Sequence, residues 1–275
     1  MHTEHLTLIT GANGKTGRRV TDRLTAAGHT VRKGSRSGTP AFDWLDVETW
    51  SAALEGVTQV YITFQPDLAY PGAKDIIERF CALAVSYGVE RLVLLSGRGE
   101  PAAQACERVV QRSGARWCIV RASWFMENFS EGHFLGPVRS GTLALPVAAE
   151  VKEPFVSVDD IADIVAAALT GDRHDGALYE VTGTRLVTFT EAMAEISEAA
   201  GRDIGYAQIP EAVFQQGMIA SGAPAPLAEF LCELFGMVLD GRNAHLTDGV
   251  QRALGRPARD FIDFAREAGD AWRVS

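Results

Sequence analysis

The sequence is poor in cysteine and has fewer basic than acidic residues. Its four cysteines are scattered and include no C-x-x-C pair: Cys81, Cys106, Cys118 and Cys232. This spacing argues against a disulfide framework and against a metal site, and it predicts buried thiols in a cytoplasmic protein. The 26 Lys and Arg against 35 Asp and Glu give a formal net charge of −9. Because proteins that bind nucleic acid carry clustered cations, no nucleic-acid partner is expected.

Long apolar runs are also missing from the 275 residues. No apolar stretch reaches the roughly 18 residues of a membrane-spanning helix, so no membrane partner is expected. The first residues, MHTEHLTL, have no basic stretch ahead of an apolar core, which argues against a signal peptide. The length fits one large domain, or one and a half, of an ordinary soluble enzyme.

Over the first 121 residues, apolar β-type runs alternate with helical stretches. The predicted strands are Leu6–Thr10, Thr30–Arg32, Gln59–Phe64, Arg91–Leu95 and Trp117–Arg121. The predicted helices between them are Lys15–Ala27, Thr49–Leu54, Asp75–Tyr87 and Ala102–Arg112. This alternation predicts a Rossmann-type α/β fold, in which helices cover both faces of a doubly wound parallel sheet.

The alternation stops after Arg121. Residues 122–150 are aromatic and glycine-rich, and an irregular segment at this point usually covers a ligand site. Regular structure is expected to resume at Asp159–Leu169, Leu178–Thr182, Phe189–Ala200 and Gly205–Ile209, with mostly helical sequence after that.

A glycine-rich loop, Gly11-Ala-Asn-Gly14-Lys-Thr-Gly17, lies between the first predicted strand and the first predicted helix. A nucleoside-triphosphate loop would need a glycine at position 9, which is Ile9. A dinucleotide loop uses its glycines for a tight turn, close approach to the pyrophosphate and helix packing. The position of the loop therefore favours a dinucleotide, although the spacing is one residue longer than G-x-G-x-x-G.

The end of the second predicted strand bears on the choice of dinucleotide. An acidic residue there would bind the ribose of NAD, whereas an arginine accommodates the 2′-phosphate of NADP. The sequence has Arg32, Lys33 and Arg36 at this place and no acid. The alternative is a solvated basic turn, but in an acidic chain three cations here favour NADP(H), with NAD(H) as the second choice.

In their order, these motifs resemble the NmrA-like branch of the atypical short-chain dehydrogenase/reductases. The segments TLITGANGKTG and VRKGSRS resemble its opening loop and arginine-bearing turn, and ERVVQRSGARWCIVRASWFMENF resembles its helix, strand and substrate-side turn. EPFVSVDDIADIVAAALT and GALYEVTG are similar to its returning helix and strand. The resemblance implies an NAD(P)-binding domain of residues 1–121 and 151–183. It also implies a smaller, mostly helical substrate lobe of residues 122–150 and 184–275.

The resemblance also implies site residues, position by position. Those expected to hold the cofactor are Gly11, Asn13, Gly14, Lys15, Thr16, Gly17, Arg36, Asp46, Val47, Thr63, Phe64, Gln65 and Ser96. Those expected on the substrate side are Trp124, Phe125, Asn128 and His133. For Trp124, Phe125, Phe129 and Phe134, plain core packing is an equally good interpretation.

The catalytic pair of ordinary superfamily members is missing. Such enzymes place Tyr-x-x-x-Lys on the helix after Ser96, where the tyrosine donates a proton. That helix reads PAAQACERVVQR, and we expect its Gln104 and Glu107 to lie on a solvated face. Tyr70-x-x-x-Lys74 has the spacing, but it precedes Ser96 and is interrupted by proline and glycine. The remaining catalytic candidates are Ser96 and His133, although a lone histidine is more often structural.

Without that pair, the sequence favours hydride transfer to an acceptor that needs no proton donor. Quinones, iminium ions and polycyclic aromatics spread or quench the charge, so orientation beside an aromatic pocket can suffice. The leading hypothesis is therefore an NADP(H)-dependent oxidoreductase with a planar, conjugated, quinone-like or aromatic small molecule as its partner. The alternatives are an NAD(P)-sensing regulator and a tailoring enzyme whose reaction is not a simple reduction. A homodimer is compatible with each of these hypotheses.

Overall fold

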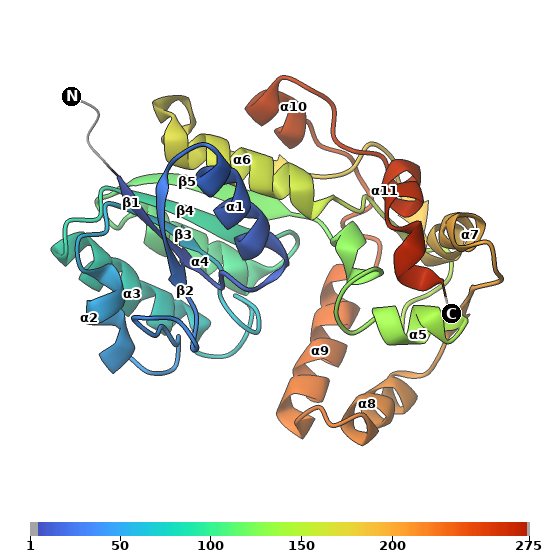
Figure 1. Ribbon diagram of the computed structural model, residues 1–275. Helices are drawn as coiled ribbons and strands as arrows, with labels where there is room; N and C mark the ends of the chain where they lie inside the picture. Colours follow the sequence, from blue (N-terminus) through green and yellow to red (C-terminus); the bar gives the residue numbers. More distant parts are fainter. Residues whose placement is uncertain (1–4, 274–275) are drawn as a thin grey trace. The chain divides into compact units, whose positions relative to one another are not determined.

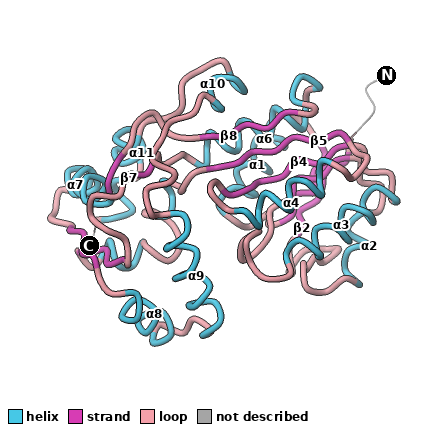
Figure 2. The backbone as a smooth tube through the Cα atoms, turned by 180° about the vertical axis from the view of Figure 1, so that it is seen from behind, coloured by secondary structure: helices cyan, strands magenta, loops and turns pink. Residues whose placement is uncertain are grey.

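The computed structural model describes residues 5–273, and its largest element is a six-stranded parallel sheet. The strands follow the order β2-β1-β3-β4-β5-β8, and each neighbouring pair is parallel. Figure 2 shows β4, β5 and β8 side by side. The strands are β1 (Leu6–Thr10), β2 (Thr30–Gly34), β3 (Gln59–Ile62), β4 (Arg91–Gly97), β5 (Arg116–Ala122) and β8 (Ala177–Val181). The predicted Rossmann-type sheet is confirmed.

Helices cover both faces of the sheet, as predicted (Figure 1). On one face, Arg23 of α1 (Lys15–Ala26) forms ion pairs with Asp159 and Asp163 of α6 (Val158–Thr170), at 2.7 and 2.5 Å. The other face carries α2 (Glu48–Leu54), α3 (Ala73–Ser86) and α4 (Pro101–Gln111). An apolar core that includes the edge-to-face rings of Trp44, Trp50 and Phe80 fixes these helices on the sheet.

The contacts divide the chain into two compact units. Unit 1 comprises residues 1–122, 158–181 and 249–256, and unit 2 comprises residues 123–157, 182–248 and 257–275. The sequence-based division assigned residues 151–183 to the first domain and residues 184–275 to the second lobe. It therefore differs at residues 151–157, which belong to unit 2, and at α10 (Gly249–Leu254), which belongs to unit 1. This helix packs with unit 1 because Gly249 lies directly against the Glu180 carbonyl, where a Cβ atom would overlap it.

Unit 2 has its own aromatic core. Phe129, Phe155, Phe189 and Phe261 are fully buried, with ring centroids 5.3 to 6.1 Å from Phe129. The Trp272 indole donates a 2.8 Å hydrogen bond to the Phe129 carbonyl. The helices of this unit are η1 (Met126–Asn128), α5 (Leu135–Arg139), α7 (Phe189–Ala200), α8 (Glu211–Ala220), α9 (Ala225–Val238), α11 (Phe261–Glu267) and η3 (Gly269–Trp272). Its strands are β6 (Thr142–Leu145), β7 (Lys152–Glu153), β9 (Val187–Thr188) and β10 (Gly205–Gln208).

Local sequence signals explain several boundaries. Helix α7 begins at Phe189 because Thr188 and Glu191 form a reciprocal capping box, and it ends before Gly201, which adopts a left-handed conformation. The four cysteines are buried free thiols, as predicted. Among residues 5–273, no helix is long and apolar enough to cross a membrane.

Candidate cofactor and substrate sites

The glycine loop lies where β1 leads into α1, and two of its glycines cannot be replaced without moving the backbone. Gly11 has a φ of +61°, and a Cβ there would overlap the Thr63 hydroxyl. A Cβ at Gly17 would overlap the Gly11 carbonyl and come within 3.0 Å of the Ala12 Cα. At these glycines no side chain covers the loop backbone, which allows the close approach that a pyrophosphate requires.

Helix α1 opens toward this loop without a side-chain cap. Its N-cap residue is Gly14, and the first turn contains no acidic side chain. The uncapped N–H groups and the positive end of the helix dipole suit an anion. In unit 1, the residues at this helix start therefore fit the diphosphate of a dinucleotide.

The strand order places the loop at a change of direction in the sheet. Strands β2 and β3 lie on either side of β1, and dinucleotides bind at such a switch point, outside the carboxyl ends of the strands. Hydrogen bonds between Thr10 and Thr63 connect β1 to the residues after β3. The Thr63 hydroxyl donates to the Thr10 carbonyl at 2.9 Å, and the Thr63 N–H donates to the Thr10 hydroxyl at 2.9 Å. The structure thus brings predicted residue Thr63 next to Gly11.

The three cations after β2 have different environments. The Arg32 guanidinium donates to the carbonyls of Ala53 and Glu55, at 2.9 and 2.6 Å, and so completes the end of α2. Lys33 and Arg36 are exposed. Arg32 is therefore engaged structurally, and Lys33 and Arg36 remain the candidates for a 2′-phosphate.

The other predicted cofactor residues of unit 1 differ in what their side chains can reach. The Phe64 ring lies 5.3 Å from the Trp44 ring and belongs to the core, so only its backbone can face a ligand. Gln65 and Asp46 are exposed, and Val47 is 42% exposed beside the short bridge of Asp43 with Asp46. Exposed apolar side chains in this segment suit a flat base.

Ser96, near the end of β4, is buried, and its hydroxyl already donates a hydrogen bond within the protein. It bonds at 2.6 Å to the Glu107 carboxylate, which the Arg121 guanidinium also holds at 2.9 and 2.6 Å. Arg121 further contacts Glu180 at 3.1 Å, and Arg98 contacts Glu180 at 2.7 Å. Burial favours a raised pKa for Glu180, but the hydrogen bonds and charges of Arg98 and Arg121 lower this pKa below its usual value.

The expectation that Glu107 lies on a solvated face is wrong, because only 3% of this residue is exposed. Its place on α4 gives the reason: Ala103 and Val110, four residues before and three after, are also buried. That helical spacing is a sequence signal that could have identified Glu107 as facing the sheet. The same helix carries no tyrosine or lysine.

We predict that Ser96→Ala will destabilise the protein more than it slows turnover. Losing a hydrogen bond to a carboxylate should lower the free energy of unfolding by about 1.5–3 kcal/mol. Turnover should fall by much less than the roughly hundredfold or more of a lost general acid, since the Ser96 hydroxyl is already hydrogen-bonded to Glu107. Urea unfolding and steady-state kinetics measure both effects, with Ser113→Ala in the turn after α4 as the control. A thousandfold loss of turnover would instead identify Ser96 as a proton donor.

The displaced pair Tyr70 and Lys74 gains no support. The Lys74 ammonium lies at the surface of α3, where it contacts Glu78 at 3.2 Å and Asp75 at 3.7 Å. A catalytic lysine would have to place its ammonium beside the tyrosine. Here the ammonium is paired with these two carboxylates instead.

The aromatic segment of unit 2 divides into core and partly exposed rings. Phe129 is fully buried, so core packing is the correct interpretation for it. The Trp124 ring stacks on Phe134 at 6.2 Å and meets Phe235 of α9 edge to face at 5.1 Å. Its indole Nε1 is buried and has no hydrogen-bond partner among residues 5–273. Such a donor needs an acceptor. The other predicted residues are partly exposed (Phe125 and Asn128) or exposed (His133).

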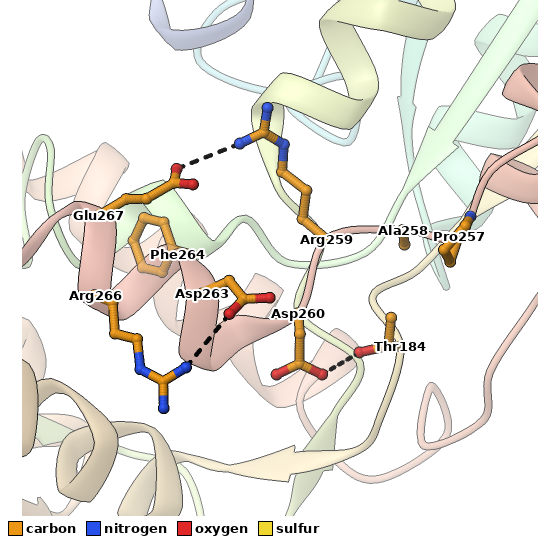
Figure 3. Close-up of a pocket in the computed structure, with 9 residues that line it drawn as sticks. All are labelled: Thr184, Pro257, Ala258, Arg259, Asp260, Asp263, Phe264, Arg266 and Glu267. Carbon is orange, nitrogen blue, oxygen red and sulfur yellow. Dashed lines mark hydrogen bonds and ion pairs between the residues drawn. The ribbon is translucent and has the colours of Figure 1, made fainter.

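A surface pocket of about 600 Å³ in unit 2 contains none of the predicted site residues (Figure 3). It is lined by Thr184, Pro257, Ala258, Arg259, Asp260, Asp263, Phe264, Arg266 and Glu267. Its three carboxylates are each paired with an arginine: Asp260 with Arg185, Asp263 with Arg266 and Glu267 with Arg259. With its charges compensated in this way, the pocket gives no reason to place the chemistry there.

The fold and the glycine loop define unit 1 as a dinucleotide-binding unit, and comparison with known proteins identifies the family. Residues 11–172 match the model of NAD(P)H-binding proteins, and residues 104–255 match the model of the NmrA-like family. The chain therefore belongs to the NmrA-like family, and its cofactor is NAD(P)(H).

Three similar proteins illustrate the range of this likeness. Agroclavine dehydrogenase of Claviceps fusiformis is 31% identical over 287 residues, with 96% of this chain and 98% of that protein covered. NAD(P)H azoreductase of Xenophilus azovorans is 29% identical over 248 residues, covering 83% and 81%. The structure of Citrobacter sp. triphenylmethane reductase complexed with NADP(H) superposes with a TM-score of 0.76 at 18% identity, covering 96% and 99%.

Proposed function

We propose that this protein is an NADP(H)-dependent oxidoreductase that transfers a hydride to a planar, conjugated small molecule. The observation that carries the proposal is the bare, uncapped glycine loop at the switch point of the sheet. The names of the relatives support the substrate class, because they include a reductase of azo compounds and a dehydrogenase of agroclavine.

Each unit has a role in this proposal. Unit 1 binds the cofactor, with Gly11, Gly14 and Gly17 at the pyrophosphate and Arg36 at the 2′-phosphate. When bound, the nicotinamide supplies the hydride. Unit 2 binds the substrate, with the Trp124 ring stacking on it and the unpaired indole N–H donating to one of its polar atoms. Phe125, Asn128 and His133 are proposed to line the same side.

The residues near Ser96 favour acceptors that need no strong acid. The Ser96 hydroxyl donates its hydrogen bond to Glu107, and α4 offers neither the tyrosine nor the lysine of ordinary superfamily members. A cationic acceptor becomes neutral on taking up a hydride, so orientation and exclusion of water can supply the catalysis.

A turnover panel tests the function. We expect the protein to oxidise NADPH in the presence of a quinone, an azo dye or a cationic triarylmethane dye. Thermal shift with each cofactor should show that NADPH stabilises the protein, since a ligand of the native state raises the melting temperature. Binding without turnover across the whole panel would contradict the oxidoreductase and favour the sensing regulator.

We predict that Arg36→Ala will weaken NADPH binding by about ten- to a hundredfold and leave NADH binding nearly unchanged. A hydrogen bond to a charged group contributes about 1.5–3 kcal/mol, and only NADPH carries the extra phosphate. Titration calorimetry with both cofactors measures the effect, and the neighbouring Lys33→Ala is the matched control. Equal losses of affinity for both cofactors would assign Arg36 a structural role. If only Lys33→Ala loses affinity for NADPH, Lys33 makes the contact with the 2′-phosphate.

A further inference from the structure

Two carboxyl groups meet at the carboxyl end of the sheet in unit 1. Glu100 lies in the turn between β4 and α4, and Asp67 lies in the loop after β3. Each carboxyl group influences the pKa of the other, so the two groups lie close together. Because two carboxylates in contact repel, such a pair holds one proton between them.

The Glu100 side chain is unusually placed for an acid. Only 7% of the residue is exposed, and Oε2 has no hydrogen-bond partner among the described residues. Its carboxyl lies directly on Gly97, the last residue of β4, where any Cβ would overlap it. A buried carboxyl without a counter-ion is stable only when it is protonated.

The surrounding groups do not neutralise Glu100. Glu107 and the Cys106 thiol on α4 lie near Glu100, and neither group can supply a positive charge to pair with its carboxyl. The arginines of this edge, Arg98 and Arg121, bond to Glu180 and Glu107 instead. The Lys74 ammonium of α3 contacts Glu78.

Burial and the neighbouring Asp67 charge raise the pKa of Glu100 to about 9. Burial also raises the pKa of Asp67, which is partly exposed and accepts a 2.7 Å hydrogen bond from the Ala69 N–H. At neutral pH the buried member of the pair is therefore the protonated one, and the partly exposed member can exchange with water.

We propose that Glu100 and Asp67 form a proton-donating pair that extends the reaction to neutral acceptors. The inference rests on the proposed function. A neutral azo or quinone acceptor takes up a hydride with its two electrons and becomes an anion. The Glu100 O–H bond then breaks as the new bond to the acceptor forms, and the carboxylate left behind regains its proton from water through Asp67. Cationic acceptors, which end neutral, do not use this proton.

The test compares Glu100→Gln with the wild type at saturating NADPH on two acceptors, a neutral azo dye and a cationic triarylmethane dye. General acids contribute about 10²–10⁴-fold, so turnover of the azo dye should fall by at least a hundredfold. Turnover of the cationic dye should stay within about threefold, because it needs no proton. Asp67→Asn should lower azo-dye turnover less, since the carboxyl of Glu100 remains.

The pH dependence gives a second measurement. A donor must be protonated, so wild-type turnover of the azo dye should be level in acid and fall as the pH rises through about 9, the pKa of Glu100. Glu90→Gln is the control, because this exposed carboxylate precedes the opposite end of β4 and should leave both dyes and the profile unchanged. If Glu100→Gln lowers the turnover of both dyes equally, or does not lower the turnover of the azo dye, Glu100 and Asp67 are not a proton-donating pair.

An infrared difference spectrum between wild type and Glu100→Gln separates this inference from the proposed function. We expect a protonated carboxyl band at pH 7 that is missing in the variant, whether or not any dye is reduced. Absence of that band refutes the proton-donating pair, even in an active enzyme. A wild type that shows the band but reduces no dye refutes the proposed function, and the donor role with it.

Discussion

Arg121→Met should lower the free energy of unfolding by about 3–5 kcal/mol, a large share of the stability of a domain. Arg121 provides two of the hydrogen bonds to Glu107, whose side chain is only 4% exposed. Removing the guanidinium leaves a buried carboxylate that retains the Ser96 hydroxyl but has lost its counter-ion. Urea unfolding measures the change.

A second substitution distinguishes charge from packing. In the double variant Arg121→Met with Glu107→Leu, both charges of this ion pair are gone and no unpaired carboxylate is buried, so most of the lost stability should return. The matched control is Arg116→Met on the same strand. Because the Arg116 side chain is 40% exposed, its loss should cost no more than about 1 kcal/mol. If the double variant is as unstable as the single one, packing of the Arg121 side chain is responsible.

Gly17→Ala should destabilise the protein and weaken cofactor binding. The added methyl group would overlap the Gly11 carbonyl, and the Thr63 hydroxyl on the other side of Gly11 leaves the loop no space to retreat. Overpacking of this kind costs about 1–3 kcal/mol. The displaced loop should also lose NADPH affinity by about tenfold or more, since the N–H groups no longer converge on one pyrophosphate. Calorimetry and thermal unfolding measure the two effects.

Gly217→Ala provides the matched control. Gly217 is also a helical glycine, but a Cβ atom there would meet nothing within 4 Å. Replacing glycine by alanine inside a helix stabilises it by about 0.5–1 kcal/mol, so this variant should be slightly more stable and bind NADPH normally. Normal NADPH binding by Gly17→Ala would contradict the assignment of the loop to the cofactor.

The amino-acid sequence by itself determined the local elements and the position of the glycine loop. Strand β1 and helix α7 have the predicted bounds, Leu6–Thr10 and Phe189–Ala200. Apolar spacing, the capping pair Thr188 and Glu191, and the glycines after helices act within a few residues. These signals can therefore be read without knowing which segments meet in space.

Only the tertiary structure decided which polar groups are buried together. Glu107 meets Arg121 of the next strand, and Glu100 meets Asp67 from a different loop. Arg32 was grouped by sequence with Arg36, yet it completes the end of α2. In each case the partner lies more than ten residues away in the chain. The charge and hydrogen bonding of a buried side chain depend on such distant neighbours, which local periodicity does not encode.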